Sequence, residues 1–469
     1  MNTFEAIYER RATRNFEKGK EVPEETWGKI IDACRYALPS PTMDFPWRML
    51  VVRDQDIKTM VANYAQEITK GAFGSSYELF RQHVWYQSDS TALRVAEYVT
   101  TGELWRYPED AHVVVFPCLS RGDSGISHSV VLRWKEQTSP YLGFAAMNMW
   151  LVATALGIGA GYNAIPLSDG RRRDELQTVL GIPPSWEATG AFSFGIGSRT
   201  RLSGPSRGAF EALVFSEYWG NPWVRLAYRQ GNYPPIPSPD KDLLAVVKNP
   251  RFVRNFRPGK IDEWMLEKVL TTAHWGPSPE NFKQWRFIVI RERAGIDFIK
   301  HIVEEWKHAP WTYNSPEWLT SQLWYLKEEE RLGKADDRRE KLGEWYDNAD
   351  TLVIPMTSTG WRDAEYTGRR GAWPHTAGHI ATGCGIQNMI LAATALDLGV
   401  HFDSNPIADV AAEELLREYF GIPSSWSPLG VMALGLPGEK MERPPVPPLE
   451  VVTFEETWGA PPRGKRYEL

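Results

Sequence analysis

The chain contains one set of segments twice, in the same order and at an almost constant spacing. Arg14 returns as Arg254, 240 positions later (254 − 14), and Trp186 returns as Trp426 at the same interval. The matching segments, first copy against second, are 10–20 and 250–260, 147–159 and 387–399, 180–186 and 420–426, and 210–222 and 449–461. A constant offset over a whole chain is typical of duplication and fusion. The sequence therefore predicts two related domains.

A proline-rich run separates the two copies. Residues 232–242 read NYPPIPSPDKD, a composition that favours an extended spacer. We therefore predict that domain one spans residues 1–222, that a linker spans 223–242, and that domain two spans 243–469.

Each copy mixes helical and extended patterns, which predicts an α+β fold. Apolar residues at helical spacing predict helices over 24–38 and 262–276, and the charged stretch 323–347 predicts a solvated helix. The expected strands are 48–54, 112–117, 191–197 and 211–215 in the first copy and 286–292, 351–356, 431–437 and 450–454 in the second. The segments around 144–156 and 382–396 are apolar on every side, so we expect two buried helices that pack against each other.

Composition argues against several classes of protein. The net charge is −6, which does not indicate a nucleic-acid surface. The 3 cysteines and 9 histidines lack the spacing of metal ligands or a disulfide framework, so we expect no metal site. The sequence has neither an apolar signal-peptide run nor a membrane-length apolar stretch, so we expect a cytoplasmic protein with no membrane partner.

Four motifs occur in both copies, some of them altered in one copy. They are R-R-x-x-R-x-F from Arg10, P-S-x-x-N-x-x-x-W from Pro277, the buried helix QNMILAATALDLG, and the run from FGIPSSW to ALGLP. Together they resemble the nitroreductase family of FMN-dependent oxidoreductases. That resemblance implies homodimers with FMN at the interface, where one subunit supplies phosphate and ring contacts and the other supplies the Pro-Ser-x-x-Asn loop. This chain resembles such a dimer written as one polypeptide, an intramolecular pseudo-dimer of two fused nitroreductase-like domains.

The resemblance implies a first composite site that is complete. A phosphate dianion favours planar arginine forks, and a flavin ring needs polar groups around its edge. Arg14 is the candidate cation near flavin N1, where reduction adds negative charge. The implied cofactor-binding residues are Arg10, Arg11, Ala12, Arg14, Arg207, Pro277, Ser278, Pro279 and Asn281.

These residues also have simpler interpretations, which the sequence leaves open. The arginines could be surface ion pairs or partners of a helix end, and Arg207 could be an ordinary surface residue. Ser278 and Asn281 could be turn formers. We expect at least one of Arg10 and Arg11 to face solvent.

The second composite site has lost several of the same features. Pro250 replaces Arg10, Phe252 replaces Ala12, and Met43 stands where the second loop has Asn281. No basic residue directly precedes the second terminal strand. Because these losses fall on one composite site, we predict one FMN per chain.

The resemblance implies hydride transfer between flavin N5 and a flat conjugated or aromatic small-molecule substrate. NAD(P)H is the candidate electron donor, stacked on the flavin, because no GxGxxG motif opens a Rossmann unit. No catalytic proton donor is identified. One alternative is a non-catalytic or lid-closed FMN-binding protein, and another is a scaffold without flavin. Because the dimer would be internal, we expect a monomer.

Overall fold

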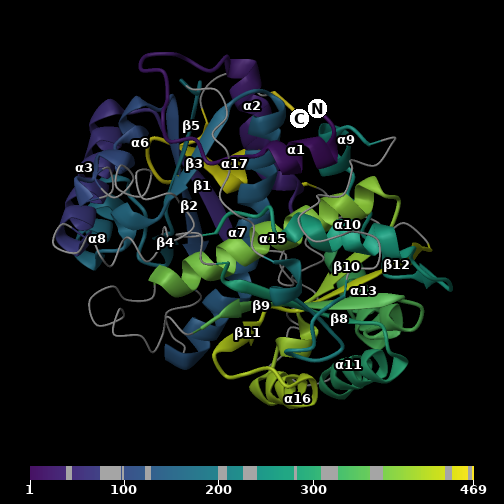
Figure 1. The fold of residues 1–469 in the computed structure, drawn as a ribbon. Helices are drawn as coiled ribbons and strands as arrows, with labels where there is room; N and C mark the ends of the chain where they lie inside the picture. The colour runs from purple at the N-terminus through teal and green to yellow at the C-terminus, as the bar shows by residue number, and fades with distance from the viewer. Residues whose placement is uncertain are drawn as a thin grey trace.

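The computed structural model shows two similar halves joined along two central helices (Figure 1). It describes residues 1–38, 45–73, 97, 100–121, 128–198, 209–224, 240–278, 283–307, 326–359, 373–438, 446–462 and 467–469. Each half combines a mixed β-sheet with surrounding helices. The predicted α+β fold is therefore confirmed.

The sheet of the first half has the strand order β13-β1-β2-β5-β3, and β4 pairs with β2. Its outer strand β13 comes from the C-terminal end of the chain. The bounds are β1 Trp47–Val52, β2 Val113–Ser120, β3 Gly159–Asn163, β4 Trp186–Ala188, β5 Ala191–Gly195 and β13 Thr453–Glu455.

The sheet of the second half has the order β10-β12-β9-β8-β6, with β11 paired to β9 and β7 paired to β12. Its outer strand β6 comes from the first half. The bounds are β6 Val214–Ser216, β7 Phe256–Arg257, β8 Trp285–Ile290, β9 Thr351–Ser358, β10 Gly399–Asp403, β11 Trp426–Pro428 and β12 Val431–Pro437.

The two sheets therefore exchange their outer strands. Val214 of β6 aligns in parallel with Phe287 of β8, and Thr453 of β13 aligns with Met49 of β1. In Figure 1 the yellow C-terminal element α17 (Leu449–Val452) lies among the elements of the first half. Each half thus completes the sheet of the other.

The expected terminal strands 211–215 and 450–454 are partly wrong. Their first residues form the 3-10 helix η4, Phe210–Ala212, and the helix α17, and only the last few residues of each arm are extended. In each arm a helical turn directly precedes the strand that pairs with the sheet of the other half. The β-branched residues of the arms predict extended structure and do not indicate this helical turn.

Helices cover both sheets and fill the contact between them. The α-helices are α1 Thr3–Glu9, α2 Glu24–Asp32, α3 Gln55–Phe73, α6 Tyr107–Asp110, α7 His128–Ala155, α8 Gly170–Val179, α9 Leu243–Lys248, α10 Glu263–Ala273, α11 Arg293–Trp306, α13 Glu328–Glu340, α15 Trp373–Ala395 and α16 Val410–Phe420. The 3-10 helices include η1 Ala33–Tyr36, η2 Glu103–Trp105, η3 Ile165–Leu167, η6 Glu344–Tyr346 and η7 Asn405–Ile407. Among the helices of the described ranges, none combines the length and the apolar character that a membrane-spanning segment needs.

The central helices α7 and α15 pack against each other, as the sequence predicts (Figure 1). Their backbones come into contact at an equivalent pair of glycines. A Cβ atom on Gly143 would collide with the carbonyl oxygen of Ile380, and one on Gly383 would collide with the carbonyl oxygen of Pro140. Both positions therefore require a residue without a side chain, since the two backbones touch there.

The repeated tryptophans hold the exchanged arms in place. Trp458 of the second arm packs on Trp186 with ring centroids 5.1 Å apart, and Trp219 of the first arm packs on Trp426 at 5.1 Å. These two equivalent contacts explain why the same tryptophans recur in both copies. They serve the join between the halves.

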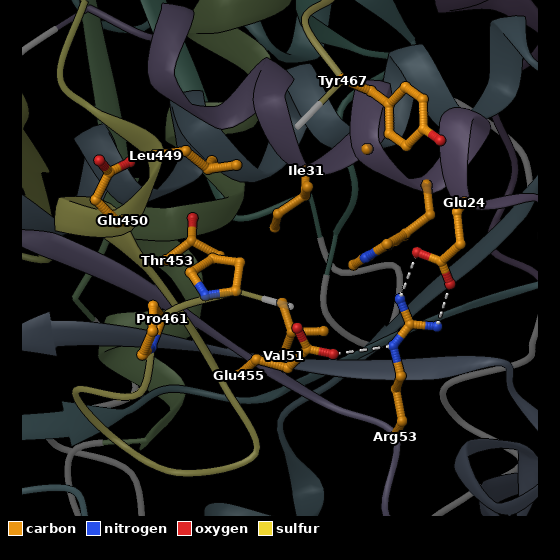
Figure 2. Close-up of a pocket in the computed structure, with 13 residues that line it drawn as sticks. Glu24, Ile31, Val51, Arg53, Leu449, Glu450, Thr453, Glu455, Pro461 and Tyr467 are labelled. Carbon is orange, nitrogen blue, oxygen red and sulfur yellow. Dashed lines mark hydrogen bonds and ion pairs between the residues drawn. The ribbon is translucent and has the colours of Figure 1, made fainter. Parts of the chain in front are cut away.

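Ion pairs fix the C-terminal arm to the first half. Figure 2 shows Arg53, which follows β1, between Glu24 of α2 and Glu455 of β13, at 3.1 and 3.2 Å. The backbone N–H of Arg53 also donates to Glu456 Oε1 at 3.0 Å. A pocket of about 100 Å³ lies between α2, β1 and this arm.

Candidate functional site

Arg10 lies at the contact between the two halves. It is 4% exposed, and its Nη2 donates to the carbonyl oxygen of Trp275 at 2.9 Å. Its guanidinium also lies over the ring of Trp150, 4.4 Å from the centroid. Trp275 belongs to the second half and precedes Pro277 by two residues. The first-half arginine cluster is therefore adjacent to the start of the second-half loop.

Arg11 also points inward. Its Nη1 donates to the carbonyl oxygens of Tyr8 and Arg10, each at 2.8 Å, and its guanidinium lies 5.2 Å from the ring centroid of Trp275. Arg10 is buried and Arg11 is half-buried. The expectation that one of them faces solvent is wrong, because aromatic rings from both halves cover these guanidinium groups.

Ala12 and Arg14 lie along the edge of β3. Ala12 forms a parallel bridge with Ala160, and the N–H of Thr13 donates to the Ala160 carbonyl oxygen at 2.8 Å. Arg14 is exposed and lies 5.6 Å from the ring centroid of Trp105. Arg14 is therefore the member of the cluster that remains accessible to a molecule in solution.

The equivalent segment of the second half is arranged differently. Arg251, the counterpart of Arg11, pairs with Asp397 at 3.0 Å on the surface. Phe252 is 6% exposed and forms the bridge to Val400 that Ala12 forms to β3. Pro250, at the position of Arg10, offers neither charge nor N–H. Arg254, the counterpart of Arg14, is exposed.

The described ends of the second-half loop are held by Ser278. The N–H of Lys283 donates to Ser278 Oγ at 2.7 Å, and the Ser278 hydroxyl donates to Gln284 Oε1 at 3.3 Å. Lys283 has a φ of 54°, a left-handed conformation that this hydrogen bond stabilises. Ser278 thus acts in part as the turn former that the sequence left open.

Several predicted residues lie outside the described part of the chain. Among the implied cofactor-binding residues these are Arg207, Pro279 and Asn281. The same holds for Met43 of the first-half loop. Pro277 is described, at the edge of the loop.

The ends of β3 and β10 carry equivalent side chains in an identical turn. Asn163 Oδ1 accepts from the N–H of Ile165 at 3.0 Å, and Asp403 Oδ1 accepts from the N–H of Asn405 at 2.9 Å. The other terminal atom of each side chain, Nδ2 in Asn163 and Oδ2 in Asp403, differs in its hydrogen bonding. Asn163 Nδ2 is buried and has no hydrogen-bond partner in the described structure, whereas Asp403 Oδ2 accepts from the hydroxyl of Tyr346 at 2.8 Å.

The residues two positions before Asn163 and Asp403 also differ between the halves. Gly161 of β3 lies so close to Thr13 that a Cβ atom would collide with the Thr13 carbonyl oxygen. Its counterpart His401 fills this place with a ring 4.8 Å from that of Trp345. Burial and then the charge of Arg254 lower the pKa of His401 to about 3, so this imidazole is neutral at pH 7.

Asp403, like His401, is a buried residue of the second half on which the charge of Arg254 acts. Burial raises the pKa of Asp403, and the hydrogen bonds from Asn405 and Tyr346 and the charge of Arg254 oppose that rise. Arg254 therefore lies near an acidic side chain of its own half. Its counterpart Arg14 lies beside a strand whose equivalent residue, Asn163, is uncharged.

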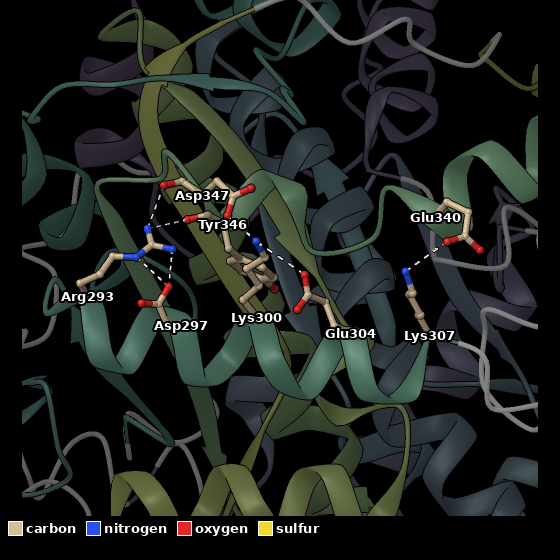
Figure 3. Close-up of polar contacts among 8 residues, drawn as sticks. All are labelled: Arg293, Asp297, Lys300, Glu304, Lys307, Glu340, Tyr346 and Asp347. Atoms are coloured by element: carbon tan, nitrogen blue, oxygen red, sulfur yellow. Dashed lines mark hydrogen bonds and ion pairs between the residues drawn. The ribbon is translucent and has the colours of Figure 1, made fainter.

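A row of ion pairs holds the segment that carries Tyr346. Figure 3 shows Arg293 of α11 donating to the carbonyl oxygens of Tyr346 and Asp347, at 3.2 and 2.8 Å. Lys300 pairs with Asp347 in the same row. Helix α11 thus fixes η6, so that the hydroxyl of Tyr346 reaches Asp403.

Sequence reasoning missed Asn163, Asp403, Gly161 and His401. The signal was present, because each pair is separated by the same 240 positions as the arginine clusters (403 − 163; 401 − 161). What the sequence does not report is that β3 runs beside the arginine segment. That proximity comes from the bridge between Ala12 and the strand.

Two other features of the described structure lie elsewhere. The pocket in Figure 2 is lined by no residue of the arginine cluster or of the described loop ends. Within the described ranges, no group of three or more His, Cys, Asp or Glu side chains could hold a metal ion.

Comparisons with known proteins match both copies. The family described as "Nitroreductase family" matches residues 7–196 and again residues 247–436. A protein of Methanothermobacter thermautotrophicus, provisionally named an NADH dehydrogenase/NAD(P)H nitroreductase, is 24% identical over 199 residues, which are 42% of this chain and 78% of the relative.

Comparison with solved structures also finds similar chains. A BluB-like flavoprotein from Clostridium difficile 630 is 20% identical, with a TM-score of 0.33, and the match covers 45% of this chain and 96% of that one. NfrA2 of B. megaterium is 14% identical, with a TM-score of 0.34, over 49% of this chain and 77% of that one. Each of these matches covers less than half of this chain.

Proposed function

The chain is a tandem member of the nitroreductase family, and from this premise we propose that it is an FMN-dependent oxidoreductase with one composite flavin site. The contact of Arg10 with the Trp275 carbonyl oxygen carries this proposal, since it joins the cationic segment of one half to the loop of the other. The substrate class we propose is a flat conjugated or aromatic small molecule. NAD(P)H is the proposed electron donor.

The residues around the first composite site suit such a cofactor. Arg10 and Arg14 supply positive charge for a phosphate or for the pyrimidine edge of the flavin. The buried and unpartnered Nδ2 of Asn163 is a donor in need of an acceptor, which an electron-rich heteroatom would provide. The loop residues Pro277, Ser278, Pro279 and Asn281, with Ala12, Arg11 and Arg207, complete the set that we propose holds FMN.

Bound FMN would supply hydride chemistry at N5. The protein's part is to bind, orient and exclude water. Arg10 is held rigidly between Trp150 and the Trp275 carbonyl oxygen, so it offers a preorganised charge. Ser278 fixes the closing end of the loop through the N–H of Lys283. The proton donor is not assigned.

The asymmetry between the halves supports a single site. In the second half, Pro250 replaces Arg10, and Phe252 is buried at the position of Ala12. The charge of Arg254 acts there on the buried His401 and Asp403. An anionic cofactor would meet a carboxylate and an aromatic ring there. A fused pair is free to lose one pocket, whereas a homodimer must build two equal ones.

The test is to purify the full chain, reconstitute it with excess FMN, remove free flavin and measure the flavin-to-protein ratio. We expect a ratio near one and a monomer by light scattering. A ratio near two contradicts the single site. A colourless protein that takes up no FMN contradicts the proposed function and favours the scaffold alternative.

Anaerobic mixing with NADH or NADPH distinguishes an FMN-dependent enzyme from a non-catalytic FMN-binding protein. Bleaching of the flavin absorption band supports a nicotinamide-driven reductase. If neither nucleotide nor any flat conjugated substrate changes the flavin spectrum, the non-catalytic FMN-binding alternative replaces the enzyme.

A further inference from the structure

Asn163 and Asp403 form a matched pair that differs in one atom. Both side chains make the same turn through Oδ1, to the N–H of Ile165 in one half and of Asn405 in the other. The shared hydrogen bond fixes which atom is the acceptor and thereby sets the orientation of the Asn163 amide. Its Nδ2 therefore occupies the place that Oδ2 occupies in Asp403.

The two second atoms have opposite chemical needs. Asp403 Oδ2 is an acceptor and receives the hydroxyl of Tyr346 at 2.8 Å. Asn163 is only 3% exposed, and its Nδ2 is a buried donor that has no hydrogen-bond partner in the described structure. An unpartnered buried donor costs stability, which a ligand acceptor would recover.

The surroundings of the two atoms also differ in charge. The arginine segments run beside β3 and β10. In the second half, burial and then the charge of Arg254 lower the pKa of His401, whereas burial raises the pKa of Asp403 and the charge of Arg254 opposes that rise. In the first half the corresponding strand positions are Gly161 and Asn163, so the strand places no charged group beside Arg14. The first site thus offers a cation with a neutral donor, and the second a cation with a carboxylate.

We infer that Asn163 is a specificity-determining residue of the first composite site, where its Nδ2 donates to an electron-rich acceptor atom of the bound ligand beside Arg14. At the second site, Asp403 uses the same position for the hydroxyl of Tyr346 and excludes such a ligand. The inference rests on the proposed function, because FMN is the ligand that the site would bind.

The experiment exchanges the two side chains at their equivalent positions. Asn163→Asp keeps the shape and the turn but places a carboxylate at the end of β3, the strand that the Arg14 segment bridges, and Asp403→Asn is the matched control. The dissociation constant of FMN is measured by fluorescence on the full chain, and the midpoint potential of the bound flavin by dye equilibration. We expect Asn163→Asp to weaken FMN at least about tenfold and to make the potential more negative.

Asp403→Asn should leave the FMN affinity of the first site within about twofold of the parent, since the mutated residue lies in the other half. Asn163→Ser removes the donor without adding charge. We expect it to weaken FMN by about threefold to tenfold, between the parent and Asn163→Asp. Urea unfolding of each variant without flavin shows whether the fold is retained, and Asn163→Ser keeps the test valid if Asn163→Asp does not fold.

Three outcomes overturn the inference. Asn163→Ser and Asn163→Asp could bind FMN with the parent's affinity and potential. Alternatively, Asp403→Asn could weaken FMN as much as Asn163→Asp, which would indicate a general effect on the fold. If the parent chain binds no FMN, the proposed function fails together with the inference, whereas the first two outcomes leave the proposed function intact.

Discussion

Gln387 of α15 donates a hydrogen bond from Nε2 to Oδ1 of Asn148 in α7, at 2.8 Å, inside the contact between the two halves. Asn148 in turn donates to the Ala33 carbonyl oxygen at 3.3 Å. The counterpart Asn388 donates to a backbone carbonyl in its own half, but its Oδ1 has no partner in the described structure, since Met147 stands where the other helix has Gln387. The interface is therefore asymmetric in its polar core as well as in its binding residues.

Replacing Gln387 by Met would make this interface symmetric and less stable. The variant leaves Asn148 Oδ1 buried without a donor, which costs about 1–3 kcal/mol. We expect the free energy of unfolding from urea titration to fall by that amount while the fold is retained. An unchanged value would show that Asn148 finds another donor.

The glycine pair at the helix crossing gives a second prediction. Gly143→Ala and Gly383→Ala each place a methyl group against a backbone carbonyl of the facing helix, so we expect a loss of about 3 kcal/mol for each. Gly333→Ala in α13 is the matched control, because no atom lies within 4 Å of its added Cβ. That control should gain about 0.5–1 kcal/mol from helix propensity. Equal effects at all three positions would contradict the close contact.

Arg14 and its counterpart Arg254 provide a direct comparison of the sites. Arg14 and Arg254 are equivalent and both exposed, so either can be changed to Ala with little effect on packing. We expect Arg14→Ala to weaken FMN binding about tenfold or more and Arg254→Ala to leave it unchanged. Equilibrium dialysis with FMN measures both. The reverse ranking would move the flavin to the second composite site.

Buried histidine predicts sensitivity to acid. The pKa of His401 is about 3 in the folded chain, below the ordinary value of about 6.5 in the unfolded chain. The unfolded state therefore binds more protons between these values, and stability falls as the pH drops from about 6.5 towards 3. Burial, the charge of Arg53 and that of Lys58 similarly lower the pKa of His112 to about 4.

The check compares His401→Gln with the parent by urea unfolding at pH 7 and at pH 5. Gln cannot be protonated, so we expect the variant to lose less stability between the two pH values than the parent does, by about 1–2 kcal/mol. His301, which is exposed on α11, is the control position for the same substitution. If the parent and His401→Gln have the same pH dependence, His401 is not the group responsible.

Much of the architecture could be predicted from the repeat. The 240-residue offset between Arg14 and Arg254 gives the two domains, and the all-apolar segments around 144–156 and 382–396 give the central pair of helices. The prediction of the central helices succeeds because a helix that is buried on all sides needs apolar side chains on every face, and this pattern is visible in the sequence. The exact ends of the arm strands could not be predicted, because the register with the other sheet is a tertiary property.

The sequence by itself determined that the first cluster has Arg10 and Ala12 where the second has Pro250 and Phe252. Only the tertiary structure decided which residues surround those clusters. Contact between Arg10 and Trp275 joins segments 265 residues apart, and the bridge from Ala12 to Ala160 places the arginine segment beside β3, the strand that ends at Asn163. Such proximity arises from the long-range packing of strands and helices. This packing produces no local pattern in the sequence from which it could be predicted.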